Sequence, residues 1–168
     1  AIPCILTLKN QTIGFCICED IWQSGPIEQI INAGAEILVS INASPFEINK
    51  AERRLKLIEA HSPDNLTFVY VNLAGGQDEL VFSGQSFVLD TQGHIKAQAP
   101  AFTEHLQTVH IQNQNIQSEI APFLDEHALI YQALCTGLYE YVTKNNFSGV
   151  LLGLSGGIDS ALTLAIAV

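Results

Sequence analysis

Cys18 is the residue of this sequence best placed to do covalent chemistry. It follows an apolar, β-rich run from Thr12 to Ile17, and the carboxylates of Glu19 and Asp20 and a turn at Ser24-Gly25-Pro26 come soon after it. A strand followed at once by a polar turn holds its last side chain on rigid backbone at the edge of a sheet. A thiol in that place can act as a nucleophile, although most free cysteines are small buried hydrophobic residues. Position alone leaves both interpretations open.

A second candidate site lies near the C-terminal end of the sequence. An aliphatic run from Gly149 to Leu154 predicts a strand, and Ala161 onward predicts a helix. The string Gly153-Leu-Ser-Gly-Gly-Ile-Asp-Ser160 joins the two. Backbone N–H groups of such a turn, together with a helix N-terminus, bind phosphate, whereas the plain alternative is a tight turn with a Ser cap. The string lacks the Lys of a Walker P-loop, so it is a different motif.

The composition predicts a globular protein and argues against several partners. Hydrophobic residues make up 48% of the chain and charged residues 14%, which is typical of a well-buried fold. The net charge of −10 leaves no basic stripe that could neutralise a nucleic-acid backbone. A single nucleotide can still be held by backbone N–H groups. No signal peptide or membrane-spanning segment is predicted.

The cysteine pattern predicts free thiols. Cys16 and Cys18 alternate across a strand, so their side chains are expected on opposite faces. Cys4 and Cys135 lie in other apolar runs, and no CxxC pair occurs. Reduced thiols of this kind indicate a cytoplasmic protein without a cysteine metal site.

The alternation of strand and helix patterns predicts an α/β fold with βαβ units and a mixed sheet covered by helices. The expected strands are Ile2–Leu8, Thr12–Ile17, Glu36–Ile41, Thr67–Leu73, Gly84–Asp90, His94–Ala99, Leu106–Ile111 and Gly149–Leu154. The expected helices are Pro26–Ala33, Asn49–His61, Pro122–Asn145 and a last one from Ala161. The expected turns are Lys9-Asn10-Gln11, Ser62-Pro63-Asp64-Asn65 and Thr91-Gln92-Gly93.

For two of these elements, the sequence also predicts which side chains are buried and which are solvated. The near-continuous apolar run Glu36–Ile41 predicts a strand buried on both faces. In the helix Asn49–His61, the charged residues Arg53, Arg54 and Lys56 are expected to be mostly solvated.

Three stretches, Gly14 to Trp22, Gly34 to Leu38 and Asn42 to Phe46, resemble the nitrilase-like carbon-nitrogen hydrolase family. In particular, they resemble the glutaminase domain of glutamine-dependent NAD synthetases, and the resemblance continues through Val71-Asn72 and Gly75–Phe82 to Asp90. It implies a nitrilase-like α-β-β-α sandwich.

The resemblance also implies roles for individual residues. Cys18 would be the nucleophile, the backbone N–H of Glu19 an oxyanion donor, and Ser44 and Lys50 the contacts to the amino-acid group of glutamine. The side chains of Glu19 and Asp20 are expected to orient the turn. The Glu and Lys that complete the family's triad lie upstream of its Cys. Since no Glu precedes Cys18 in this sequence, neither partner is assigned.

The Gly-rich string resembles the pyrophosphatase loop of the N-type ATP pyrophosphatases, and Tyr131–Lys144 resembles the helix that opens the synthetase domain of NAD synthetases. This implies the start of a Rossmann-like domain, with Asp159 as a Mg²⁺ ligand. The residues implied to hold ATP are Gly153, Leu154, Ser155, Gly156, Gly157, Ile158, Asp159 and Ser160.

We therefore expect a glutaminase part at residues 1–112, a linker at 113–122 marked by the polar run Gln112–Ser118, and a synthetase part at 123–168. Because the sequence has no Met, begins within a strand pattern and ends within a helix pattern, we expect it to be a piece of a longer polypeptide. Because the triad partners of Cys18 are not found in it, we expect this piece to be inactive by itself. The implied enzyme, expected to be a homo-oligomer, uses glutamine, ATP and deamido-NAD to make NAD. The alternatives are another nitrilase-branch amidase with an appended nucleotide-binding domain, or a non-catalytic assembly module.

Overall fold

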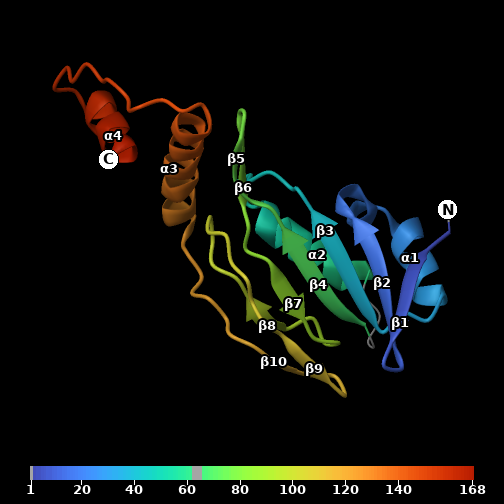
Figure 1. The fold of residues 1–168 in the computed structure, drawn as a ribbon. Helices are drawn as coiled ribbons and strands as arrows, with labels where there is room; N and C mark the ends of the chain where they lie inside the picture. Colours follow the sequence, from blue (N-terminus) through green and yellow to red (C-terminus); the bar gives the residue numbers. More distant parts are fainter. Residues whose placement is uncertain (1, 62–65) are drawn as a thin grey trace.

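A six-stranded mixed sheet organises the chain in the computed structural model, which describes residues 2–61 and 66–168 (Figure 1). The strand order is β1-β2-β3-β4-β7-β8. The strands are β1 (Cys4–Leu8), β2 (Gln11–Ile17), β3 (Ile37–Asn42), β4 (Thr67–Asn72), β7 (Phe87–Leu89) and β8 (Ile95–Gln98).

Parallel strands form the middle of this sheet and antiparallel strands form its edges. β2, β3 and β4 run parallel, while β1, β7 and β8 pair antiparallel with their neighbours. The β1–β2 turn places Lys9 and Asn10 at φ values of 47° and 65°, the left-handed backbone that tight hairpins need. The predicted hairpins and the mixed, βαβ-based sheet are confirmed. The turn expected at Ser62–Asn65 lies outside the described residues.

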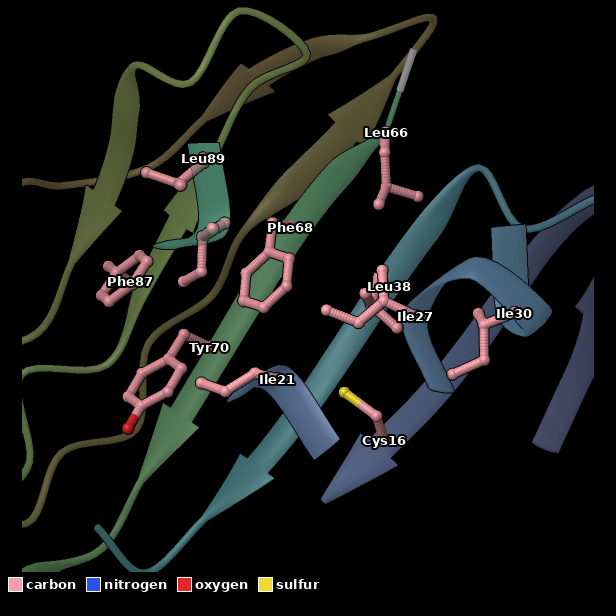
Figure 2. Packing of buried hydrophobic residues seen from close by; sticks show 11 residues of the cluster. Cys16, Ile21, Ile27, Ile30, Leu38, Leu66, Phe68, Tyr70, Phe87 and Leu89 are labelled. Atoms are coloured by element: carbon pink, nitrogen blue, oxygen red, sulfur yellow. The ribbon is translucent and has the colours of Figure 1, made fainter. Parts of the chain in front are cut away.

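Helices α1 (Ser24–Asn32) and α2 (Lys50–His61) connect the parallel strands and cover one face of the sheet. Figure 2 shows the side chains that fill this layer, from Cys16 on β2 to Leu89 on β7. Gly14 allows the close approach of α1, because a Cβ atom there would lie 2.1 Å from Ile30 Cγ2. The Tyr70 and Phe87 rings stack at 5.0 Å in the same core.

The opposite face of the sheet is more open. Ile41 on β3 is 53% exposed, and Ile17 on β2 and Val71 on β4, its register partners, are also exposed. The expectation that Glu36–Ile41 is buried on both faces is therefore confirmed at Ile37, which is buried on this face, and wrong at Ile41. Leu38 and Ser40 face the helices and are fully buried, whereas Val39 on the open face is half-buried.

Two hairpins stand apart from the main sheet, β5 (Ala74–Gln77) with β6 (Leu80–Ser83), and β9 (His110–Gln112) with β10 (Asn115–Gln117). Of the strand expected at Leu106–Ile111, only β9 forms. β10 lies within the stretch expected to be a linker, and Gln98 on β8 bridges to Ile120 just after it. The boundary between the two parts stays a prediction.

The long helix α3 (Glu126–Lys144) packs against the β5–β6 hairpin. The expected start at Pro122 is wrong, because the Asp125 side chain accepts a hydrogen bond from the Ala128 N–H and caps the helix. Gly76 lets the helix approach, since a Cβ there would lie 2.9 Å from the Glu140 Cβ. Lys144 donates to the Gly76 carbonyl.

The strand expected at Gly149–Leu154 does not form. A strand needs a neighbour for its N–H and C=O groups, and no described strand pairs with this run. Its side chains are exposed, including Leu151 and Leu154. The helix expected from Ala161 begins earlier, as α4 (Ile158–Ala167), and lies beyond α3 (Figure 1). None of the described helices combines the length and apolarity needed to cross a membrane.

Candidate active site

Cys18 lies at a sharp turn between a strand and a short helix. β2 ends at Ile17, and the 3₁₀ helix η1 (Cys18–Trp22) begins at Cys18. The φ of Cys18 is 42°, in the left-handed region that non-glycine residues rarely adopt. Ile21 is buried and fixes the turn to the core. The Cys18 thiol is free and exposed, which is the presentation that a nucleophile needs.

The carboxylate of Asp20 stabilises this turn. It accepts a hydrogen bond of 2.9 Å from the Ile17 N–H, so the prediction that an acidic side chain orients the turn holds for Asp20. Glu19 is the second residue of η1, directly after the thiol. The role of its N–H as an oxyanion donor stays a prediction.

Ser44 follows β3 and is held by the side-chain amide of Asn72, the last residue of β4. The Ser44 N–H donates to Asn72 Oδ1 at 2.9 Å, and Asn72 Nδ2 donates to the Ser44 carbonyl at 3.3 Å. Asn42 makes a second bridge, since its Nδ2 donates to the carbonyls of Ser40 and Val71. All four polar side chains at positions 40, 42, 44 and 72 are buried. Asn42 and Asn72 were not among the predicted site residues, and their signal in the sequence is an Asn at the end of each of two parallel strands.

Lys50 opens α2 and lines a cavity of about 180 Å³. Its Nζ lies 2.5 Å from Glu47 Oε1, and that contact lowers the pKa of the Glu47 carboxyl. Phe46 and Arg54 line the same cavity, and so do residues from β6 and α3. The predicted glutamine contact thus borders a real cavity, although its role in binding stays a prediction.

Arg54 is buried, and the expectation that it is solvated is wrong. Only 4% of its surface is exposed, and its Cζ lies 4.4 Å from the Tyr70 ring centroid. Its Nη2 donates to Ser44 Oγ at 3.4 Å. Burial lowers the pKa of Arg54. Helical periodicity could have indicated this position, since residue 54 lies one turn before the buried Ile58.

Tyr70 connects this cluster to the thiol. Burial raises the pKa of the Tyr70 phenol, the Arg54 guanidinium lowers it, and the charge of a Cys18 thiolate raises it. The last effect requires that Cys18 lie within electrostatic reach of Tyr70. Cys18 and Ser44 follow the neighbouring parallel strands β2 and β3, and α2 contacts η1, so they lie near the carboxyl ends of these strands, whereas Cys18 does not line the cavity beside Lys50.

The Gly-rich loop forms a separate cluster at the N-terminus of α4. Gly156 has a φ of 86°, and Gly157 is the N-cap residue. The Ser155 and Ser160 hydroxyls lie 3.0 Å apart, and Ser160 Oγ donates to the Gly157 carbonyl. Asp159 is exposed in the first turn of the helix. No three His, Cys, Asp or Glu residues of the described chain gather at a metal site.

The sequence patterns of two families match this chain. Carbon-nitrogen hydrolase matches residues 4–120, and NAD synthase matches residues 130–168. A glutamine-dependent NAD(+) synthetase from Acinetobacter baylyi is 44% identical over 92% of this chain. The chain spans only 29% of that relative's length.

Two solved structures resemble this chain. The glutamine-dependent NAD+ synthetase from Acinetobacter baumannii, solved in complex with ADP, superposes with a TM-score of 0.92 at 40% identity. The overlap covers 98% of this chain and 32% of that one. A nitrilase-superfamily amidase from Nesterenkonia superposes on 60% of this chain and 38% of its own, with a TM-score of 0.53 at 20% identity, which shows the shared fold alone. Because the first family match spans residues 4–120, the chain belongs to the carbon-nitrogen hydrolase family.

Proposed function

We propose that this chain is part of a glutamine-hydrolysing NAD synthetase. One observation carries the proposal: a single chain holds an exposed thiol on a strained strand-to-helix turn and a Gly-rich loop at a helix N-terminus. The first is a nucleophile and the second is a phosphate-binding arrangement. The relatives that cover 92% to 99% of the chain are glutamine-dependent NAD(+) synthetases.

In the first reaction, the Cys18 thiolate attacks the carboxamide carbon of glutamine. The C–N bond breaks, ammonia leaves with an added proton, and a thioester remains. Water then attacks the thioester carbon, which releases glutamate and restores the thiol. The Glu19 N–H is proposed to stabilise the oxyanion, and Ser44 and Lys50 to hold the amino-acid group.

In the second reaction, ammonia converts the carboxylate of deamido-NAD to the carboxamide of NAD. ATP activates that carboxylate by transfer of its AMP group, with release of pyrophosphate, and ammonia then displaces AMP. The open backbone at Gly156 and Gly157 fits a phosphate, since no atom lies within 4 Å of a Cβ placed at Gly156. Ser155 and Ser160 supply hydroxyls beside it. The proposed ATP contacts otherwise come from Gly153, Leu154, Ile158 and Asp159.

Mg²⁺ would be held by the Asp159 carboxylate together with the phosphates. Mg²⁺ is commonly bound by one carboxylate together with several phosphate oxygens. Asp159 is exposed and therefore accessible to such an ion. The ion would neutralise phosphate charge. We place the enzyme in the cytoplasm, because its free thiols fit a reducing compartment. We also propose that the full-length enzyme is a homo-oligomer.

The nitrogen source distinguishes this proposal from its alternatives. The full-length protein, meaning a polypeptide of the relatives' length that contains this sequence, should make NAD from deamido-NAD and ATP with either glutamine or ammonium salt. Cys18→Ala should abolish glutamine-dependent synthesis and keep ammonia-dependent synthesis within a few-fold, because only the first needs the thiol. A plain amidase would make no NAD, and an assembly module would hydrolyse no glutamine. Unchanged glutamine use by the variant would reduce Cys18 to a packing residue.

A further inference from the structure

The buried cluster around Arg54 contains polar groups to which the proposed nucleophile gives no role. Among the described residues, the buried side-chain atoms without a well-formed hydrogen bond are Arg54 Nε and Tyr70 Oη, although Ser44 lies close enough to Tyr70 to offset part of the rise that burial causes in the pKa of the phenol. They belong to one contact, in which the guanidinium lies over the phenol ring at 4.4 Å. Unsatisfied buried polar groups are rare and costly. Two in one contact, beside a nucleophile, indicate a place that something else completes.

Arg54 is buried without an ion-pair partner in the described chain. Arg54 is its one buried charged residue, and none of the ion pairs found there includes the guanidinium. Lys50, one helical turn earlier, is already paired with Glu47. Both cations line the cavity of about 180 Å³. The carboxylates of Glu47, Glu52 and Glu126 line it as well, but Glu47 and Glu52 are paired with Lys50 and Lys56, so the Arg54 guanidinium is the cation of this cavity without an ion-pair partner.

The geometry links this charge to the predicted substrate contact. Arg54 Nη2 donates to Ser44 Oγ, and the Ser44 backbone is fixed in turn by Asn72. Tyr70 supports the flat guanidinium from one side and lies within electrostatic reach of Cys18. A planar group with several donors can hold a hydroxyl with one nitrogen and leave another for a further acceptor.

On the basis of the proposed function, we propose that Arg54 is a positioning residue: it fixes the Ser44 hydroxyl and supplies the positive charge by which the site selects amides that carry a free carboxylate over neutral amides. Glutamine is such a substrate, and a simple aliphatic amide is not. Arg54 acts through Ser44 and through its charge, so it contributes to substrate selection and not to bond breaking.

The test compares two reagents that alkylate Cys18 in the full-length protein. One is a diazoketone analogue of glutamine, which carries the amino-acid group, and the other is iodoacetamide, which is neutral and lacks it. Mass spectrometry of the Cys18 peptide gives both rates. Arg54→Met should slow the analogue roughly tenfold or more, as expected for a lost charged hydrogen bond, and leave the iodoacetamide rate within about twofold.

Arg53→Met is the matched control, because Arg53 is exposed and carries the same charge one position earlier. Both rates should stay at the wild-type level. Arg54→Lys keeps the charge but loses the planar donors, so its analogue rate should lie between those of wild type and Arg54→Met. If Arg54→Met does not fold, Arg54→Lys decides the question by the same two rates.

Equal slowing of both reagents in the Arg54 variants would mean that the side chain only supports the fold, and the proposal would be overturned. Unchanged analogue labelling would overturn it as well. A failure of the proposed function gives a different result, in which wild-type Cys18 shows no preference for the analogue over iodoacetamide.

Discussion

Cys16 and Cys18 are two residues apart and have opposite environments. Cys16 lies in the core under α1, while Cys18 lies exposed at the turn after β2. The left-handed φ of Cys18 costs of order 1–3 kcal/mol and persists because Ile21 and Asp20 hold the turn. Strain of this kind at a residue with a reactive side chain supports its role as the nucleophile.

At the residue scale, Cys16 should make stability depend on alkaline pH. Burial raises its pKa above the ordinary 9.0, so the folded protein keeps a proton that the unfolded chain loses. The free energy of unfolding should therefore fall as the pH rises through about 9. Cys16→Ala removes this contribution.

Thermal unfolding midpoints at about pH 8 and about pH 10 check this prediction. The drop between the two should be smaller in Cys16→Ala than in wild type. The other three thiols are common to both proteins, so their effects cancel. An equal drop in the variant would contradict the prediction.

At the element scale, the close packing of α1 against β2 fixes the strand that leads into the Cys18 turn. Gly14→Val would drive a side chain into Ile30, where even a Cβ lies at 2.1 Å. Overpacking of this kind costs roughly 1–3 kcal/mol or more, so the urea midpoint of unfolding should fall clearly. Gly25→Val is the control, because nothing lies within 4 Å of a Cβ there. Equal midpoints for the two variants would disprove the close packing of α1.

The loop before α4 supports a separate prediction at this scale. Gly157 has a φ of −85°, and a Cβ there meets only Ser155 Oγ at 3.6 Å, so Gly157→Val should fold. In the full-length protein, the added side chain should block backbone approach to the phosphates. ATP binding should weaken at least tenfold, and NAD synthesis should be lost with both glutamine and ammonia.

Isothermal titration with ATP measures the affinity, and Gly25→Val should bind like wild type because it lies on α1. ATP affinity equal to wild type in Gly157→Val would rule out this loop as the phosphate site.

At the scale of the whole molecule, the described chain leaves much apolar surface uncovered. One face of the sheet exposes Ile17 and Ile41, and the run 149–154 exposes Leu151 without forming a strand. The chain spans 29% to 36% of the length of the relatives from Acinetobacter baylyi and Aquifex aeolicus. We therefore expect residues 1–168 by themselves to make no NAD from deamido-NAD and ATP with either nitrogen source. Measurable turnover above a no-protein control would contradict this.

Local sequence determined much of the fold and of the candidate site. Strand and helix periodicity predicted the parallel strands, α1 and α2, because those patterns follow from which side chains each element buries. The Cys18 turn and the Gly-rich loop were visible because turn residues and chemically distinctive side chains stand together in the sequence. The predicted contact Ser44 lies beside that turn because β2 and β3 are parallel neighbours.

Only the tertiary structure decided what depends on residues distant in sequence. Arg54 lies one helical turn before the buried Ile58, which indicates an inward position, but only the fold shows that Tyr70 of β4 and Ser44 of the loop after β3 contact its charged group. The run 149–154 has strand propensity, but a ladder needs a partner that no described strand supplies. Composition and spacing state what each residue can do, whereas burial and pairing depend on which segments meet in space.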